Sequence, residues 1–201
     1  PSTPMTRSST TRYGSRGQSL MTEETKRMKT AMMCALTVTV LLAAPGAAYA
    51  KDAKAEAKLE SRSGSTVTGT VIFTQHGGKV AMKVAVSGLT PGIHAMHLHD
   101  KGDCSAPDAA SAGGHWNPTS EDHGKWAHAP FHHGDIGNLV ADAKGKAELS
   151  MESELWTLGD GKPSDVVGHA VIVHAKEDDF TTQPTGNAGG RVACGVIQKV
   201  P

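Results

Sequence analysis

The sequence predicts an all-β protein, an eight-stranded Greek-key barrel or sandwich with two long functional loops. Three observations favour this fold: short segments rich in β-branched residues, 23 glycines among 201 residues, which suit a chain with many turns, and no convincing amphipathic helix. Aromatic residues make up only 4% of the chain, so the core must rest on aliphatic side chains. The chain has 20 basic and 20 acidic residues, and this balance argues against a nucleic-acid-binding protein.

Each expected strand is marked by its composition or by a neighbouring turn. Gly77-Gly78 predicts a two-residue hairpin, and the polar turn at 142–145 predicts a second one. Two polar stretches, roughly 100–134 and 175–190, are longer than ordinary connections, and loops of that length are usually functional. The expected strands, in chain order, are 66–73, 79–86, 94–100, 138–141, 146–149, 166–175 and 191–198.

Residues 1–50 are expected to be an N-terminal extension and a secretory signal peptide that is removed. Three basic residues at 26–29 precede an apolar run at 31–44, and Ala48-Tyr49-Ala50 matches a cleavage site. Fourteen apolar residues are fewer than the roughly 20 that span a membrane, so no stable membrane insertion is expected; a short anchoring helix is the alternative. Because the chain begins with Pro1, Met21 or Met28 is expected to be the natural start.

The remaining domain, 51–201, carries 14 basic and 18 acidic residues, a net charge of −4. It keeps two cysteines, Cys104 and Cys194. An even pair of cysteines in an exported protein predicts a disulfide, with two buried free thiols as the alternative. A periplasmic or secreted location follows from the same reasoning.

The histidines point to a metal centre. All 11 lie between His76 and His174, a density that a solvated surface does not need. His97 and His99 are two residues apart on an expected strand, so both imidazoles lie on one face. Three imidazoles with one carboxylate suit zinc, and three or four imidazoles suit copper. The spacing alone does not divide the candidate ligands between two ions; they are His97, His99, His115, His123, His132, Asp135 and His174.

Six ordered segments of the domain resemble the copper/zinc superoxide dismutase family, of the secreted or periplasmic bacterial type. The resemblance runs from about residue 55 to the end of the chain. Six segments with matching functional positions are far more specific than any one motif. They are GIHAMHLH at 92–99, GDC at 102–104, GGHWNP at 113–118, HHGDIGNL at 132–139, GHAVIVHA at 168–175 and GNAGGRVACG at 186–195.

The resemblance implies one copper and one zinc per chain, with a role for each matching residue. His115 bridges the two ions, Arg191 lies beside the copper, Asp178 links His97 to His123, and His94 braces the site without binding metal. A Cys104–Cys194 disulfide ties the first long loop to the last strand. The implied copper ligands are His97, His99, His115 and His174, and the implied zinc ligands are His115, His123, His132 and Asp135.

The implied reaction converts two superoxide ions and two protons to dioxygen and hydrogen peroxide by copper redox cycling, and so protects against superoxide in the periplasm or outside the cell. His115 and Arg191 are the expected catalytic residues, and the chain is expected to be a monomer or a homodimer. One departure concerns Pro184, which stands where many eukaryotic relatives carry a lysine that steers the substrate. The segment between His174 and Arg191 also looks shorter than in those relatives.

Three alternatives remain open at this point. A copper chaperone or a periplasmic metal buffer on the same fold would bind metal without catalysis, and an adhesive sandwich domain would need no metal at all. Arg191 could be an ordinary surface residue paired with a carboxylate. Four further histidines are expected to lie away from the metals: His76, His128, His133 and His169.

Overall fold

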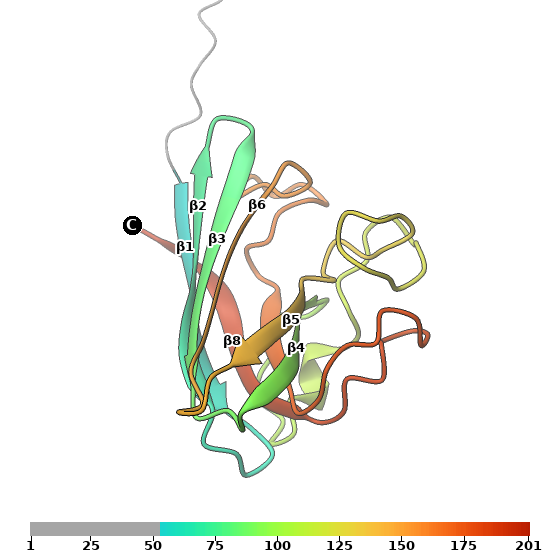
Figure 1. Cartoon of the computed structure of the whole chain (residues 1–201). Helices are drawn as coiled ribbons and strands as arrows, with labels where there is room; N and C mark the ends of the chain where they lie inside the picture. Colours follow the sequence, from blue (N-terminus) through green and yellow to red (C-terminus); the bar gives the residue numbers. More distant parts are fainter. Residues whose placement is uncertain (1–52) are drawn as a thin grey trace, which may run out of the picture. The chain divides into compact units, whose positions relative to one another are not determined.

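The computed structural model describes residues 53–201, and the expected signal peptide at 1–50 lies outside the described residues (Figure 1). Eight strands and one short 3₁₀ helix make up the described part of the chain. Their bounds are β1 Ala53–Ser61, β2 Thr68–His76, β3 Lys79–Ser87, β4 Gly92–His99, η1 Ala110–Ala112, β5 Gly137–Ala141, β6 Ala147–Ser153, β7 Ala170–His174 and β8 Arg191–Val200.

The strands form one antiparallel sheet in the order β5-β4-β7-β8-β1-β2-β3-β6. The sheet curls so that its two edge strands, β5 and β6, approach each other and nearly close a barrel (Figure 1). The prediction of an eight-stranded all-β fold is therefore confirmed.

The first strand was not among the predicted ones. The sequence of β1, AKAEAKLES, alternates apolar and charged residues, and Ala55, Ala57 and Leu59 point into the core. The alternation has the two-residue period of a strand. Alanine, lysine and glutamate nevertheless favour helices over strands by intrinsic propensity. Pairing with β2 and β8 on both sides decides the conformation here.

The two predicted hairpins have different outcomes. The Gly77-Gly78 turn joins β2 to β3 with His76 paired to Lys79, and Gly77 has a positive φ of 58° that suits such a turn. The prediction of a hairpin around 142–145 is wrong. A tight turn forms there, but β5 pairs with β4 and β6 pairs with β3. The turn connects β5 and β6, the two edge strands of the sheet. Local sequence cannot distinguish such a connection from a hairpin.

The hydrophobic core holds mainly aliphatic side chains, together with the aromatic rings of Phe73, Trp116 and Trp156. Trp156 is almost fully buried, packs edge-on against Phe73, and donates from Nε1 to the carbonyl oxygen of His133 at 3.0 Å. The long connections between β4 and β5 and between β7 and β8 lie together beside the barrel (Figure 1). Among residues 53–201, no helix is long and apolar enough to cross a membrane.

Candidate metal centre

Strand geometry and a backbone bridge bring four histidines together. His97 and His99 lie on the same side of β4, as the two-residue spacing predicts. His174 ends β7, directly after a register shift in the pairing of β7 with β8. Such a shift changes the direction in which the following side chain points. His115 comes from the first long loop, which forms an isolated antiparallel bridge between His115 and His99.

The ligand nitrogens of these four histidines converge in a buried space. One nitrogen from each of His97, His99, His115 and His174 lies within 4.8 Å of the other three. Nδ1 of His97 and Nε2 of the other three are buried without a hydrogen-bond partner. A buried polar atom with no partner is costly unless it binds something. Four such lone pairs, all from imidazole, fit a nitrogen-preferring metal such as copper.

The opposite ring nitrogens of three of these histidines are held by fixed acceptors. Nε2 of His97 donates to Oδ2 of Asp178 at 2.7 Å. Nδ1 of His99 donates to the carbonyl oxygen of Gly113 at 3.0 Å, and Nδ1 of His174 donates to that of Gly189 at 3.2 Å. Each acceptor fixes the ring and its tautomer, so the free lone pair is directed into the space between the rings.

A second group of four residues shares His115. Three imidazoles surround Oδ1 of Asp135, each with its Nδ1 atom. The distances are 2.8 Å for His115, 3.0 Å for His123 and 3.2 Å for His132. The four ligand atoms lie within 4.8 Å of one another, and all four residues are buried. Oδ2 of Asp135 accepts from the backbone N–H groups of Gly124 and His132, which fixes the carboxylate. Three imidazoles with one carboxylate fit a tetrahedral zinc site.

The two groups differ in their electrostatics. Burial lowers the pKa of His174 to about 3 and that of His115 to about 4, and it holds the pKa of His99 well below its usual value. These imidazoles are therefore neutral at pH 7, the form that binds a metal. Burial acts in the same direction on His123, but hydrogen bonds with Asp135 and Asp178 outweigh it and raise its pKa to about 9.

The two carboxylates next to His123 are both ionised. Burial alone would raise their pKa values, but hydrogen bonds from imidazoles hold the pKa of Asp135 and of Asp178 well below the usual range. Asp178 contacts both groups, since its Oδ2 accepts from His97 and its Oδ1 lies 2.9 Å from Nε2 of His123. This concentration of negative charge fits a divalent cation among the zinc-type ligands.

His94 contacts the site without joining either group. Its Nδ1 donates to the carbonyl oxygen of His174 at 2.9 Å, and its Nε2 lies 3.2 Å from the Thr90 hydroxyl. The side chain is buried and spans from the start of β4 to the end of β7. This placement agrees with the expected bracing role.

Arg191 is held by loop carbonyl groups, not by a carboxylate. Its Nη1 donates to Ala109 and its Nη2 donates to Gly113, both at 2.7 Å. Burial lowers its pKa, but an arginine guanidinium stays charged in proteins. Within the described residues, no carboxylate forms an ion pair with it. The alternative of an ordinary surface ion pair therefore finds no support.

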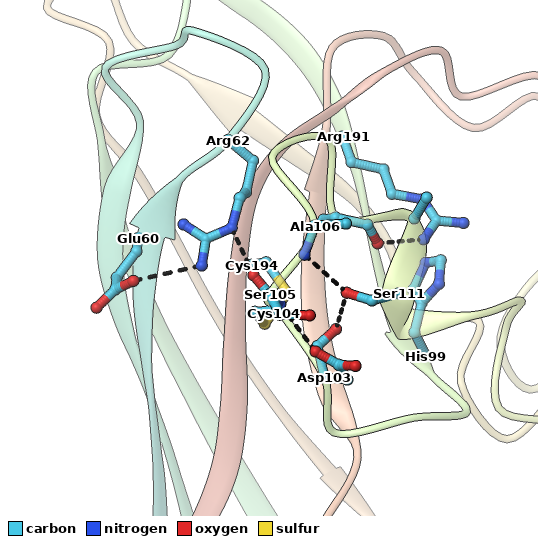
Figure 2. Close-up of a disulfide and its surroundings, with 12 residues drawn as sticks. Glu60, Arg62, His99, Asp103, Cys104, Ser105, Ala106, Ser111, Arg191 and Cys194 are labelled. Carbon is cyan, nitrogen blue, oxygen red and sulfur yellow. Dashed lines mark hydrogen bonds and ion pairs between the residues drawn. A yellow bond between two sulfur atoms is a disulfide. The ribbon is translucent and has the colours of Figure 1, made fainter.

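Cys104 and Cys194 form a disulfide, as predicted, with Cα atoms 5.8 Å apart. The bond joins the first long loop to β8, the strand that begins with Arg191 (Figure 2). Arg62 holds the same loop from another direction, because its Nε donates to the Cys104 carbonyl oxygen at 3.0 Å. The loop is thus tied to β8 by a covalent bond and to the end of β1 by a hydrogen bond.

The four other histidines lie outside both groups, as expected. His76 and His128 are exposed. The ring of His169 stacks 4.6 Å from Trp116, and its Nδ1 donates to the carbonyl oxygen of Asp100. His133 is half-buried and packs edge-on against Trp116, although it directly follows a candidate ligand.

Two supporting residues had not been predicted. The side-chain amide of Asn138 pairs with the backbone of Asp178: its Oδ1 accepts at 2.8 Å and its Nδ2 donates at 3.0 Å. The carbonyl oxygen of Gly113 accepts from a candidate copper ligand and from Arg191. Both residues lie inside motifs that carried the resemblance, but no sequence pattern indicates which backbone group an amide or a carbonyl will contact.

The fold and the site together define a class: an antiparallel β-barrel protein with two candidate metal-binding groups that share one histidine. Comparisons with known proteins identify the family. Residues 67–197 match the family described as copper/zinc superoxide dismutase. The chain belongs to this family, whose members are oxidoreductases that use copper and zinc.

Individual relatives agree with this assignment. The chain is 38% identical to the extracellular Cu-Zn superoxide dismutase of Brugia pahangi over 157 residues, 73% of this chain and 76% of the relative. It is 43% identical to the Cu-Zn superoxide dismutase of Caulobacter vibrioides over 135 residues, 65% of this chain and 78% of the relative. A crystal structure of the clock protein EA4 is similar with a TM-score of 0.66 and 38% identity, over 75% of this chain and 96% of that one.

Proposed function

We propose that this chain disproportionates superoxide with copper in the His97, His99, His115, His174 group and zinc in the group that contains Asp135. The reaction consumes two superoxide ions and two protons and yields one dioxygen and one hydrogen peroxide. The observation that carries the assignment is the pair of buried four-ligand groups sharing His115. When bound, copper supplies the one-electron redox change that the reaction requires, and zinc supplies fixed positive charge without redox chemistry.

The chain's own residues hold the ligands, attract the substrate and handle protons. The acceptors at Asp178, Gly113 and Gly189 orient the copper-side imidazoles before any ion binds. Arg191 presents a permanent positive charge beside His99, where a small anion would approach (Figure 2). We assign proton delivery to Nε2 of His115, the atom of the shared histidine that faces the copper group.

We also propose that residues 1–50 are removed on export, which leaves 51–201 as the working enzyme in the periplasm or outside the cell. The disulfide supports an oxidising compartment. The similarity to an extracellular relative points the same way. In this setting the enzyme would protect the cell against superoxide. A monomeric or homodimeric state stays a prediction.

The ligand assignment can be tested with two substitutions and metal analysis. His174→Ala should abolish copper binding and activity and keep zinc, because His174 belongs only to the first group. Asp135→Ala should mainly lose zinc, because it removes the only carboxylate of the second group. If Asp135→Ala kept full zinc occupancy, the assignment would be wrong. Metal binding without any superoxide consumption in the wild type would favour a metal buffer or chaperone instead.

A further inference from the structure

The loop between β7 and β8 holds His123 of the first long loop at both its side chain and its backbone. The side chain of His123 is held by Asp178, whose Oδ1 lies 2.9 Å from Nε2. Its backbone is held separately by Gln183. The backbone N–H of His123 donates to Oε1 of Gln183 at 2.9 Å, and Nε2 of Gln183 donates to the His123 carbonyl oxygen at 2.8 Å. Ring and backbone of one residue are thus fixed from the same loop.

The amide of Gln183 makes the same pair of bonds that a neighbouring β-strand would make with a single residue. It is the counterpart of Asn138, whose amide pairs in the same way with the backbone of Asp178. The two contacts support the two ends of the Asp178–His123 interaction. One fixes the carboxylate that orients the imidazole, and the other fixes the main chain from which the imidazole projects.

The Gln183 contact matters because the backbone of His123 is not held by regular secondary structure. It belongs to no strand or helix, and its neighbours Asp122 and Lys125 are exposed. Its Nδ1 must nevertheless lie 3.0 Å from Oδ1 of Asp135. The imidazole is attached to the backbone through Cα, so a shift of the backbone would move Nδ1 away from Asp135. Within the described residues, Gln183 provides the only side-chain hydrogen bonds to the backbone N–H and carbonyl groups of His123.

We propose that Gln183 is a positioning residue for zinc retention, acting through the backbone of His123. The inference rests on the proposed assignment of His123 to the zinc site. Replacing groups that hydrogen-bond directly to metal ligands costs about 10–100-fold in affinity. Gln183 contacts the ligand's main chain, not its imidazole, so the lower end of that range, about tenfold, is expected. Copper should be little affected, because in the described part of the chain the Gln183 side chain forms its hydrogen bonds with His123 and not with a proposed copper ligand.

The test uses the fully loaded enzyme and a matched pair of substitutions. Gln183→Met keeps the side-chain length and removes both hydrogen bonds. Gln198→Met makes the same change at an exposed position on β8. Transfer of zinc to a chromophoric chelator and release of copper are followed in parallel. In the metal-free proteins, amide hydrogen exchange at His123 is measured. Gln183→Glu serves as a second variant, because its carboxylate can accept from the His123 N–H but cannot donate to the carbonyl oxygen.

We expect Gln183→Met to release zinc about tenfold faster than the wild type, with copper release within twofold and faster exchange at the His123 amide. Gln183→Glu should fall between Gln183→Met and the wild type, and Gln198→Met should match the wild type. Zinc release at the wild-type rate in both Gln183 variants would overturn the inference, and so would equal acceleration of zinc and copper release. A wild type that binds no zinc would overturn the proposed ligand assignment as well, which distinguishes the two failures.

Discussion

His99 and Arg191 donate hydrogen bonds to the same carbonyl oxygen, that of Gly113, at 3.0 and 2.7 Å. This single carbonyl oxygen therefore holds the His99 imidazole and the Arg191 guanidinium close to each other. The guanidinium cannot move away from the site without losing this bond and the one to Ala109. A positive charge so fixed can attract an anion locally although residues 51–201 carry a net charge of −4.

Substitution of Arg191 should change the rate through electrostatics. Steering by local charge raises association rates by roughly 10–1,000-fold and weakens as salt screens it. We expect Arg191→Glu to lower the second-order rate much more than Arg191→Ala, with copper content unchanged. The wild-type rate should fall as ionic strength rises, and in Arg191→Glu this trend should flatten or invert. Stopped-flow or pulse-radiolysis kinetics at several salt concentrations measure both effects.

Lys144→Glu controls for the change in net charge, because Lys144 is exposed in the turn between β5 and β6. It should have a much smaller effect. The family resemblance implies that Pro184 stands where many eukaryotic relatives carry a steering lysine, and on that basis Arg191 should contribute a larger share of the attraction. A wild-type rate indifferent to salt, together with a fully active Arg191→Glu, would show that steering does not depend on this residue.

Asp178→Asn should loosen both metal groups. The carboxylate accepts from His97 with one oxygen and from His123 with the other. An amide can accept with only one atom and would place its own N–H groups against an imidazole N–H. We expect a loss of about 10–100-fold in zinc affinity, measured by competition with a chelator. Asp179→Asn is the matched control, because among the described residues the neighbouring Asp179 side chain bonds to Thr181 and Thr182 and to no histidine. Equal zinc affinity in the two variants would contradict this role of Asp178.

Gly186 should tolerate no side chain. A Cβ atom there would overlap Oδ1 of Asp178 and lie 2.6 Å from Nε2 of His123, and φ is +67°. Gly186→Ala must therefore displace the Asp178–His123 contact, and we expect weaker zinc binding and a lower thermal midpoint. Gly190→Ala, in the same loop, meets nothing within 4 Å and should bind zinc like the wild type. Isothermal titration with zinc and thermal unfolding compare the two. Similar behaviour of both variants would argue against close packing at Gly186.

Removal of the disulfide should destabilise the fold. The bond joins residues 90 positions apart. For a loop of that length, restriction of the unfolded chain stabilises the protein by about 4–5 kcal/mol in the chain-entropy account. The double variant Cys104→Ser, Cys194→Ser should therefore unfold at lower denaturant concentration and retain metal less well. Equilibrium unfolding of the wild type, oxidised and reduced, gives the comparison. No difference between oxidised and reduced wild type would contradict the expectation.

The sequence analysis predicted the barrel and the candidate ligands, for reasons that differ from one residue to the next. Strand periodicity predicts that His97 and His99 share one face, and the other histidines nearby in the sequence make this pair a candidate for metal binding. The division of His115, His123 and His132 between two ions came from the family resemblance, since spacing contains no information about which loop residues meet. The structure then places these residues in two groups that share His115.

Other features depend on contacts between distant segments. β1 was missed because its residues favour helices, and its conformation is set by pairing with β2 and β8. Gln183 and Asn138 contact backbone groups 60 and 40 residues away, and a side-chain amide carries no sequence signal for its partner. The turn at 142–145 resembles a hairpin locally, but the strands that it joins, β5 and β6, are the two opposite edges of the sheet and pair with other strands.

The central claim is that copper in the four-histidine group disproportionates superoxide. The most direct test is a titration of copper-free, zinc-loaded protein, residues 51–201, with copper, while superoxide consumption and bound copper are measured together. Activity should be absent at the start, rise in proportion to bound copper and stop rising at one copper per chain. His174→Ala should stay inactive throughout the titration. Full activity in copper-free protein, or none after one equivalent has bound, would contradict the account.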